Sequence, residues 1–375
     1  KRFKEAVAAA DAGQPSRAFQ LATAAVLADP DHAEARRVMG YEAVDGDWLT
    51  PYQQKQRRRG YQWSGHFGWV KAEDLPRYRS GERRVGRRWV SAKQDAATRE
   101  RIEDGWTVRT DHFVVTTNHS LEEGVRLAAE LESLFQVWRQ WFAGYWLSDR
   151  EVRDLFNDRR DARVRSRPMQ VYYHRDKAAY VAYLRRLQPR IAETLGIYFD
   201  DRREAHFFAG GDDAELARAT LHHEAAHQLF TENGPGKRGA GRLANFWLIE
   251  GIACYFELLA PANEVGRYTF GDPAQGRLPS AVARGPVLPL GELTAFGQSD
   301  LQRLDDLAAV YAQSTGVVTM LRHGRHADTD AEALVRTLRE VYSGRPDGEE
   351  IARQTGRSLS DLDLQYRRFL ANLSP

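Results

Sequence analysis

Residues 221–228 read Leu-His-His-Glu-Ala-Ala-His-Gln, and this stretch decides how the rest of the chain is interpreted. An acidic pair precedes it and Gly-Pro-Gly follows at 234–236, so the pattern predicts a helix. On a helix, His223 and His227 are four residues apart, which places both imidazoles on one face, about one turn apart. Two imidazoles so placed can bind one Zn²⁺ through nitrogen. Glu224 lies about 100° around the helix, where it can reach a metal-bound water without binding the metal itself.

A catalytic zinc also needs a third protein ligand and an open position for water. Residues 245–257, Asn-Phe-Trp-Leu-Ile-Glu-Gly-Ile-Ala-Cys-Tyr-Phe-Glu, predict a second helix. Its apolar core stripe comprises Phe246, Ile249, Ala253 and Phe256. Glu250 lies beside that stripe, where a carboxylate is costly to bury unless a cation meets it. We therefore expect one zinc ion per chain, bound by His223, His227 and Glu250.

The combination of His-Glu-x-x-His with a downstream Trp-Leu-x-Glu-Gly-x-Ala-x-Tyr-x-Glu resembles the gluzincins, the thermolysin and aminopeptidase N-like members of the peptidase MA-like superfamily. The resemblance is specific at these two helices. It extends more loosely over residues 101–375, whose layout is similar to a bacterial family of predicted gluzincin-like proteins. It implies a zincin-like fold, the same three zinc ligands, Glu224 as general base, and Glu257 as a carboxylate that orients a ligand histidine.

Departures from the related patterns narrow the resemblance. A metzincin would need Gly and His where Phe230 and Asn233 stand, so that branch is excluded. Thermolysin has an Asp where this chain has Cys254, which favours the aminopeptidase-like branch. No Gly-x-Met-Glu-Asn segment is present to bind a free substrate amine, so exopeptidase specificity does not carry over and an endopeptidase is favoured.

The reaction implied by this ligand set is hydrolysis of a peptide or protein substrate, with Glu224 taking a proton from water and passing it to the leaving amine. Tyr311, in a helix predicted over 305–321, begins a Tyr-Ala-Gln-Ser segment similar to one in the predicted family. Gluzincins commonly place a tyrosine or histidine over the zinc to stabilise the oxyanion. A core tyrosine explains Tyr311 equally well, and Tyr255 and Tyr268 compete for the role.

Two other classes of protein remain open. A non-catalytic metallopeptidase-like protein could use its N-terminal region to bind partners, although Glu224 argues against a purely structural zinc. The other class is a metal-free helical protein in which the motif is accidental. With 11 histidines in 375 residues, a His-Glu-x-x-His spacing arises by chance in roughly a few per cent of chains of this composition. Among the other histidines, His206 is interpreted as an ordinary strand histidine in preference to one at a sheet edge above the cleft, where it could hold a substrate strand. His222 is assigned a structural hydrogen bond, and His323 and His326 only end a helix.

The chain divides by pattern into three regions with an overall α+β layout. Residues 1–45 are alanine-rich and resemble a tetratricopeptide-type helical hairpin, too short for a groove but able to cap or to dock a protein partner. Residues 46–100 form a small module in which Gly46–Thr50 is echoed by Arg87–Ser91, with Gly68–Val70 between them, each a short strand with a tryptophan. These tryptophans are interpreted as a small core rather than a ligand platform. Residues 101–375 form the predicted catalytic domain.

In that domain the sequence predicts strands and helices in alternation, then helices from 212 onward apart from a Gly/Pro-rich stretch at 271–290. The expected elements are strands at 107–117, a helix over 120–145, a strand at 169–173, a helix over 177–187, and a hairpin of 196–200 with 204–209.

Charge and composition limit the partners. The formal net charge is +2 and the arginine-rich stretches, at 57–59, 83–88 and 159–167, are short, so nucleic-acid binding is not expected. Cys254 is the only cysteine, which excludes an intrachain disulfide and a cysteine metal cluster. No window is apolar enough for a membrane span. The sequence begins at Lys1, so a secreted or periplasmic location is favoured if a signal peptide preceded it, and is otherwise left open.

Overall fold

The computed structural model describes residues 1–159, 167–210, 213–235, 239–261, 268–270, 276–344 and 346–373, with the backbone alone at 261 and 268–270. Most of the arginine-rich stretch 159–167 lies outside these ranges, and so does Asp212, one of the two expected cap residues. The chain forms two compact units that alternate along the sequence. The first unit comprises residues 1–25, 137–160 and 218–375, and the second comprises 26–136 and 161–217. The expected α+β fold class is confirmed by many helices and a five-stranded mixed sheet.

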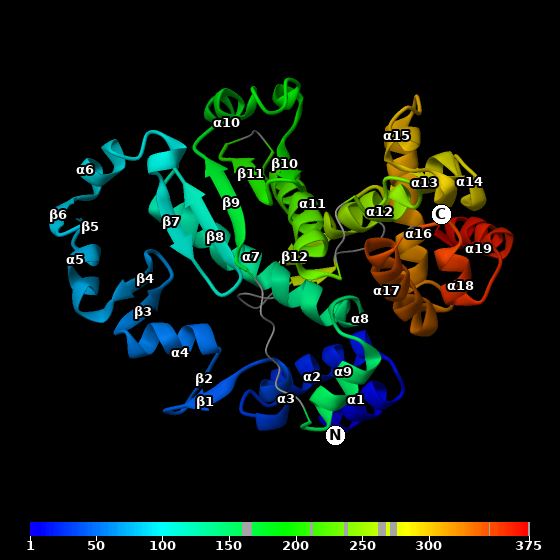
Figure 1. Cartoon of the computed structure of the whole chain (residues 1–375), viewed down its shortest axis with the longest axis horizontal. Coiled ribbons are helices and arrows are strands. Elements are labelled where there is room, and N and C mark those ends of the chain that lie inside the picture. The colour runs from blue at the N-terminus through cyan, green and yellow to red at the C-terminus, as the bar shows by residue number, and fades with distance from the viewer. Residues whose placement is uncertain are drawn as a thin grey trace. The chain divides into compact units, whose positions relative to one another are not determined.

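The second unit contains the five-stranded sheet, in the order β10-β11-β9-β8-β7 (Figure 1). β8 pairs in parallel with β9, and β9 with β11, while the outer pairs are antiparallel. Alternate residues of β8 are buried, as expected for a strand with one face on a core. The strands are β7 (Trp106–Arg109), β8 (Phe113–Thr117), β9 (Met169–His174), β10 (Gly196–Phe199) and β11 (Glu204–Phe208), which confirms the predicted strands.

The helices of this unit are slightly shorter than predicted. α7 (Leu121–Trp141) begins after Ser120, whose hydroxyl accepts a hydrogen bond from the Glu123 amide at 3.2 Å. It ends before the expected residue 145 because the backbone leaves the helical region at Phe142 (φ −125°), and α8 (Ala143–Trp146) is a separate turn. α10 (Lys177–Leu184) packs against β9 and β11.

A buried histidine pair lies beneath α10. His206 is on β11, between β10 and β9, so the alternative that it lies at a sheet edge is wrong, and the favoured interpretation as a strand histidine is confirmed. The period-2 pattern shows a strand but not its neighbours, which depend on long-range pairing. His174 Nε2 and His206 Nδ1 are 3.2 Å apart, and both side chains are fully buried. Tyr172 stacks on His206 at 4.7 Å between ring centroids, so the pair is enclosed by aromatic rings.

Residues 42–97 form three consecutive repeats of a hairpin followed by a helix, a regularity of which the sequence showed only part (Figure 1). The second strands carry Trp48, Trp69 and Trp89, which recur 21 and 20 residues apart. The repeats are β1 (Glu42–Val44), β2 (Asp47–Leu49) and α4 (Pro51–Arg58); β3 (Tyr61–Ser64), β4 (Gly68–Lys71) and α5 (Leu75–Arg79); and β5 (Glu82–Val85), β6 (Arg88–Ser91) and α6 (Ala92–Ala97).

Helices dominate the first unit. α2 (Pro15–Ala28) begins at a proline, and its first free amides are capped from a distant part of the chain. Glu332, on α17 (Ala327–Ser343), accepts from the amides of Ser16 at 2.8 Å and Arg17 at 3.2 Å. α1 (Arg2–Asp11) packs against α9 (Asp149–Phe156). These contacts join residues 1–25 to α9 and α17, in the unit that also contains the predicted zinc ligands.

Those ligands are carried by α11 (Ala214–Asn233) and α12 (Phe246–Phe256), both close to their predicted bounds. Asp213 caps α11 by accepting from the amides of Glu215 and Leu216, and Gly234 follows its last residue. α12 packs mainly against α16 (Leu307–His323). Gly251 allows this approach, because a Cβ there would lie 2.8 Å from the Ser314 carbonyl oxygen.

The prediction of almost uninterrupted helix after residue 212 was wrong in two respects. β12 (Leu259–Pro261) and β13 (Tyr268–Phe270) form an antiparallel pair, and the stretch 271–290 contains the helix α13 (Leu278–Arg284). Pro279 occupies the first turn of α13, where its missing N–H costs nothing. The other helices of the described C-terminal part are α14 (Leu290–Ala295), α15 (Gln298–Leu301), α18 (Glu350–Thr355) and α19 (Leu359–Leu373).

Candidate metal centre

The two histidines of α11 face each other as the helical spacing predicts. Their ring centroids are 4.9 Å apart, and their Nε2 atoms are separated by 3.2 Å. His222, the neighbouring residue, is fully buried on another face of the helix. The i, i+4 spacing therefore brings His223 and His227, and not His222, to one point.

Glu250 extends from α12 to the same point. Its carboxylate oxygens lie 3.5 Å from His223 Nε2 and 3.8 Å from His227 Nε2, and the residue is only 7% exposed. Donors at about 2.0–2.1 Å from a tetrahedral ion lie about 3.3 Å from one another. The three donor atoms, all within 4.8 Å of each other, could therefore hold one metal ion after small side-chain adjustments.

Two of the three side chains have the charge that suits a cation, whereas His223 carries a proton that a metal would displace. Burial lowers the pKa of His223, but its hydrogen bonds with Cys254, Glu250 and Glu257 outweigh burial and raise that pKa well above 6.5. Burial favours the neutral form of Glu250, but His227, His223 and Tyr311 outweigh this effect and lower its pKa, so it is a carboxylate at neutral pH. Burial lowers the pKa of His227, although Glu250 and Glu224 oppose that shift, so its imidazole is neutral. A buried carboxylate beside a neutral imidazole is the form in which both bind a metal.

Glu257 and Arg277 orient His223. His223 Nδ1 donates to Glu257 Oε1 at 2.9 Å, which leaves Nε2 directed toward Glu250 and His227. Arg277, just before α13, donates to both oxygens of Glu257 at 3.0 Å. Burial opposes ionisation of Glu257, but the bonds to His223 and Arg277 lower its pKa. The role that the resemblance implied for Glu257 thus has a matching contact.

A second donor group, formed by His223, Cys254 and Glu257, lies on the other side of the same imidazole. Cys254 Sγ is 3.9 Å from His223 Nδ1, and burial raises the pKa of its thiol. Arg277 already neutralises Glu257 there, and a metal would have to displace the His223 proton. In the group that includes Glu250 a metal would also displace the His223 proton, but Arg277 pairs with Glu257 rather than with Glu250, so this group is the better candidate.

Glu224 is half-buried on α11, one residue after His223. Its negative charge contributes to favouring protonation of His227. Glu224 thus lies on the ligand-bearing helix, next in sequence to one of the predicted ligands.

Three tyrosines were candidates for an oxyanion donor. Among the described side chains, that of Tyr311 contacts a predicted zinc ligand. Its hydroxyl donates to the Glu250 carboxylate, and burial followed by the charge of Glu250 raises its pKa. Tyr255 instead makes a 2.6 Å hydrogen bond with His323. The side chain of Tyr268 lies outside the described part of the chain.

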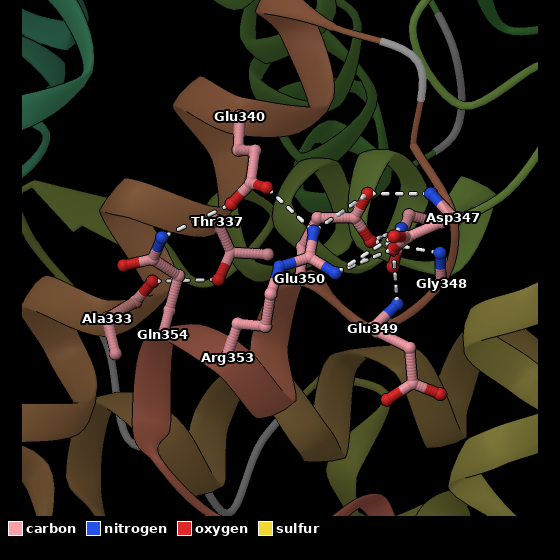
Figure 2. A network of polar contacts seen from close by, with 10 residues as sticks. Ala333, Thr337, Glu340, Asp347, Gly348, Glu349, Glu350, Arg353 and Gln354 are labelled. Carbon is pink, nitrogen blue, oxygen red and sulfur yellow. Dashed lines mark hydrogen bonds and ion pairs between the residues drawn. The ribbon is translucent and has the colours of Figure 1, made fainter.

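The start of α12 is fixed by a buried polar network. Asn245 adopts a left-handed conformation (φ 59°) and donates to Glu350 Oε2 at 2.6 Å. Glu350, 1% exposed, also accepts from the amides of Asp347 and Gly348 (Figure 2). Arg353 connects Asp347 to a neighbouring helix through Glu340. The helix that carries Glu250 is therefore anchored to residues a hundred positions later in the chain.

The sequence did not indicate Arg277 as a site residue. Its one local signal is the Leu-Pro pair that follows, which is typical of a helix start but says nothing about the partner of the arginine. Comparison with known proteins found no family model that matches the chain and no curated protein with significant similarity. Among the described residues, no helix is long and apolar enough to cross a membrane.

Proposed function

We propose that the chain is a zinc-dependent metallopeptidase of the gluzincin type, with a zincin-like catalytic region and an endopeptidase activity. The observation that carries the proposal is the convergence of His223, His227 and Glu250 from two helices, at spacings of 3.2 to 3.8 Å between donor atoms. Two imidazoles and one carboxylate, with a fourth position left for water, are the donor set of catalytic zinc sites in peptidases.

Each residue of the site has a distinct part in this proposal. A zinc ion held by the three ligands would acidify a water molecule and polarise the substrate carbonyl. Glu224 takes the proton of the attacking water on its carboxylate and returns it to the leaving amine. Tyr311 supplies an O–H donor near the position where the oxyanion develops, and Glu257 keeps His223 in the tautomer that presents Nε2.

Metal content tests the ligand assignment. Protein purified without chelators or metal-affinity tags is expected to contain zinc in near-equimolar amount. The His227→Ala variant should lose it because a ligand is removed, whereas His326→Ala, an exposed histidine at the start of α17, should retain it. A full zinc load in His227→Ala would show that the ligand assignment is wrong.

Activity separates an enzyme from a metal-containing binding protein. Glu224→Gln should keep its zinc while peptide-library digestion slows by roughly 10²–10⁴-fold, because an amide cannot accept the proton from water. Equal digestion by both proteins would remove Glu224 from its role, and no digestion by the wild type would favour the binding protein.

A further inference from the structure

The hairpin repeats carry a strong excess of positive charge. Residues 46–100 contain 13 lysines and arginines against six carboxylates, while the whole chain has 54 against 52. The rest of the chain is therefore net negative. The excess is concentrated in the second unit, away from the predicted ligands of the first unit in sequence.

Most carboxylates of this segment are already paired. Asp47 binds Arg57, Asp74 binds Arg84, and Glu82 binds Arg77, at 2.6 to 2.8 Å. Seven exposed cations are not among the ion pairs of the described residues; we call them the basic surface, and they are Lys55, Arg58, Arg59, Arg79, Arg87, Arg88 and Lys93. Their positive charges are thus not offset by ion pairs within the described structure.

Local helix electrostatics explain only some of these positions. Arg58 and Arg79 lie in the last turns of α4 and α5, where a cation interacts favourably with the helix dipole. Arg87 and Arg88 are adjacent in the turn between β5 and β6, with no helix end to stabilise them. Lys93 is in the first turn of α6, where the dipole disfavours a cation. An external anion would account for these three.

The surroundings of the basic surface indicate what kind of anion fits. No large hydrophobic side chain of residues 42–97 is exposed, so nothing there would insert into a membrane. The aromatic rings pack on each other or beneath arginine, with Trp63 on Trp69 at 5.6 Å and Arg77 over Trp89 at 4.1 Å. Trp48 is the exception among the described aromatic residues of this segment: it is partly exposed, and its indole N–H donates to Asp31. One such ring is not the row of aromatic rings on which successive nucleic-acid bases stack. What the three repeats share is their positive charge.

We infer that the basic surface docks an acidic, unstructured segment of another protein. Such a segment can follow three repeats with its carboxylates, since a flexible chain adapts to cations that no groove holds in a fixed arrangement. Regularly repeated modules create extended surfaces of this kind. The inference does not depend on the metal centre.

Fluorescence anisotropy with a labelled poly-glutamate peptide of about 16 residues tests this at low and physiological salt. Wild-type protein should bind the peptide, and binding should weaken as salt is raised. The triple variant Arg79→Gln, Arg87→Gln, Arg88→Gln should bind about tenfold or more weakly. A matched control, Arg186→Gln, Arg303→Gln, Arg325→Gln, removes the same charge from exposed positions elsewhere and should change the affinity by less than about twofold.

Three outcomes would overturn the inference. The first is no binding of poly-glutamate by the wild type, and the second is equal weakening in both triple variants, which would indicate only net charge. The third is tighter binding, through the same arginines, of single-stranded DNA or phosphatidylserine vesicles than of poly-glutamate, which would assign the basic surface to another class of partner. Because zinc content and peptidase activity are not measured, failure here leaves the proposed function untouched.

Discussion

The buried His174–His206 pair should make the second unit sensitive to acid. His174 is fully buried, and burial together with the neighbouring His206 lowers its pKa to about 3, from 6.5 in the unfolded chain. Burial also lowers the pKa of His206, although Glu204 opposes that shift. Both rings are therefore neutral in the folded protein under conditions in which the unfolded chain binds protons.

The direction and size of the effect follow from proton linkage. Above pH 6.5 neither state protonates His174, and its full contribution to stability is present. Between pH 6.5 and about 3 only the unfolded state binds the proton, so stability is lost progressively as the pH falls. With about 1.36 kcal/mol for each pH unit, the loss is about 3 kcal/mol at pH 4.5 and approaches 5 kcal/mol below pH 3.

Urea unfolding between pH 8 and 4.5, with a chelator present so that metal binding does not contribute, measures this loss. Carboxylates titrate in the lower part of the same pH window. The relevant quantity is therefore the slope of the free energy of unfolding against pH, compared between wild type and His174→Phe. Phenylalanine suits the aromatic surroundings of Tyr180 and Tyr183 and removes the titrating group. Hydrogen exchange of the β9 and β11 amides localises the effect. An equal pH slope in wild type and variant would refute the reasoning, and His326→Gln serves as an exposed control.

Three further predictions concern the first unit. Tyr311→Phe should lower turnover on a confirmed substrate by roughly 10²-fold while zinc content is unchanged, because its hydroxyl acts on the transition state; normal turnover would return Tyr311 to a packing role. Glu332→Ala should lower the free energy of unfolding by about 1–3 kcal/mol, since two amides at the start of α2 lose their acceptor, whereas Glu332→Gln should cost less. Glu350→Ala should cost about 2–4 kcal/mol, because it leaves the buried Asn245 side chain and two backbone amides, one of them buried, without their acceptor; it should also weaken zinc binding through α12. Unchanged stability in chemical denaturation would contradict the anchoring role.

Local patterns predicted the elements that carry the site. The caps and glycines around residues 214–233 correctly bounded α11, because helix ends depend on nearby residues. The sequence analysis did not predict α13, although Pro279 marks its start, because the surrounding glycines and prolines were interpreted as a loop. The position of His206 within the sheet was left open for a different reason: its strand was predicted correctly, but strand order depends on pairing with β9, whose partner residues are more than thirty positions away.

By itself, the sequence determined that His223 and His227 share one helix face, because the helical period places residues four apart together whatever surrounds them. It also indicated Glu250, because a carboxylate within an apolar helix needs a cation. Only the tertiary structure decided that Arg277 holds Glu257 against His223, that Tyr311 donates to Glu250, and that Glu332 caps α2 from 316 residues away. These contacts join segments that approach only when helices pack, and no local period encodes that packing.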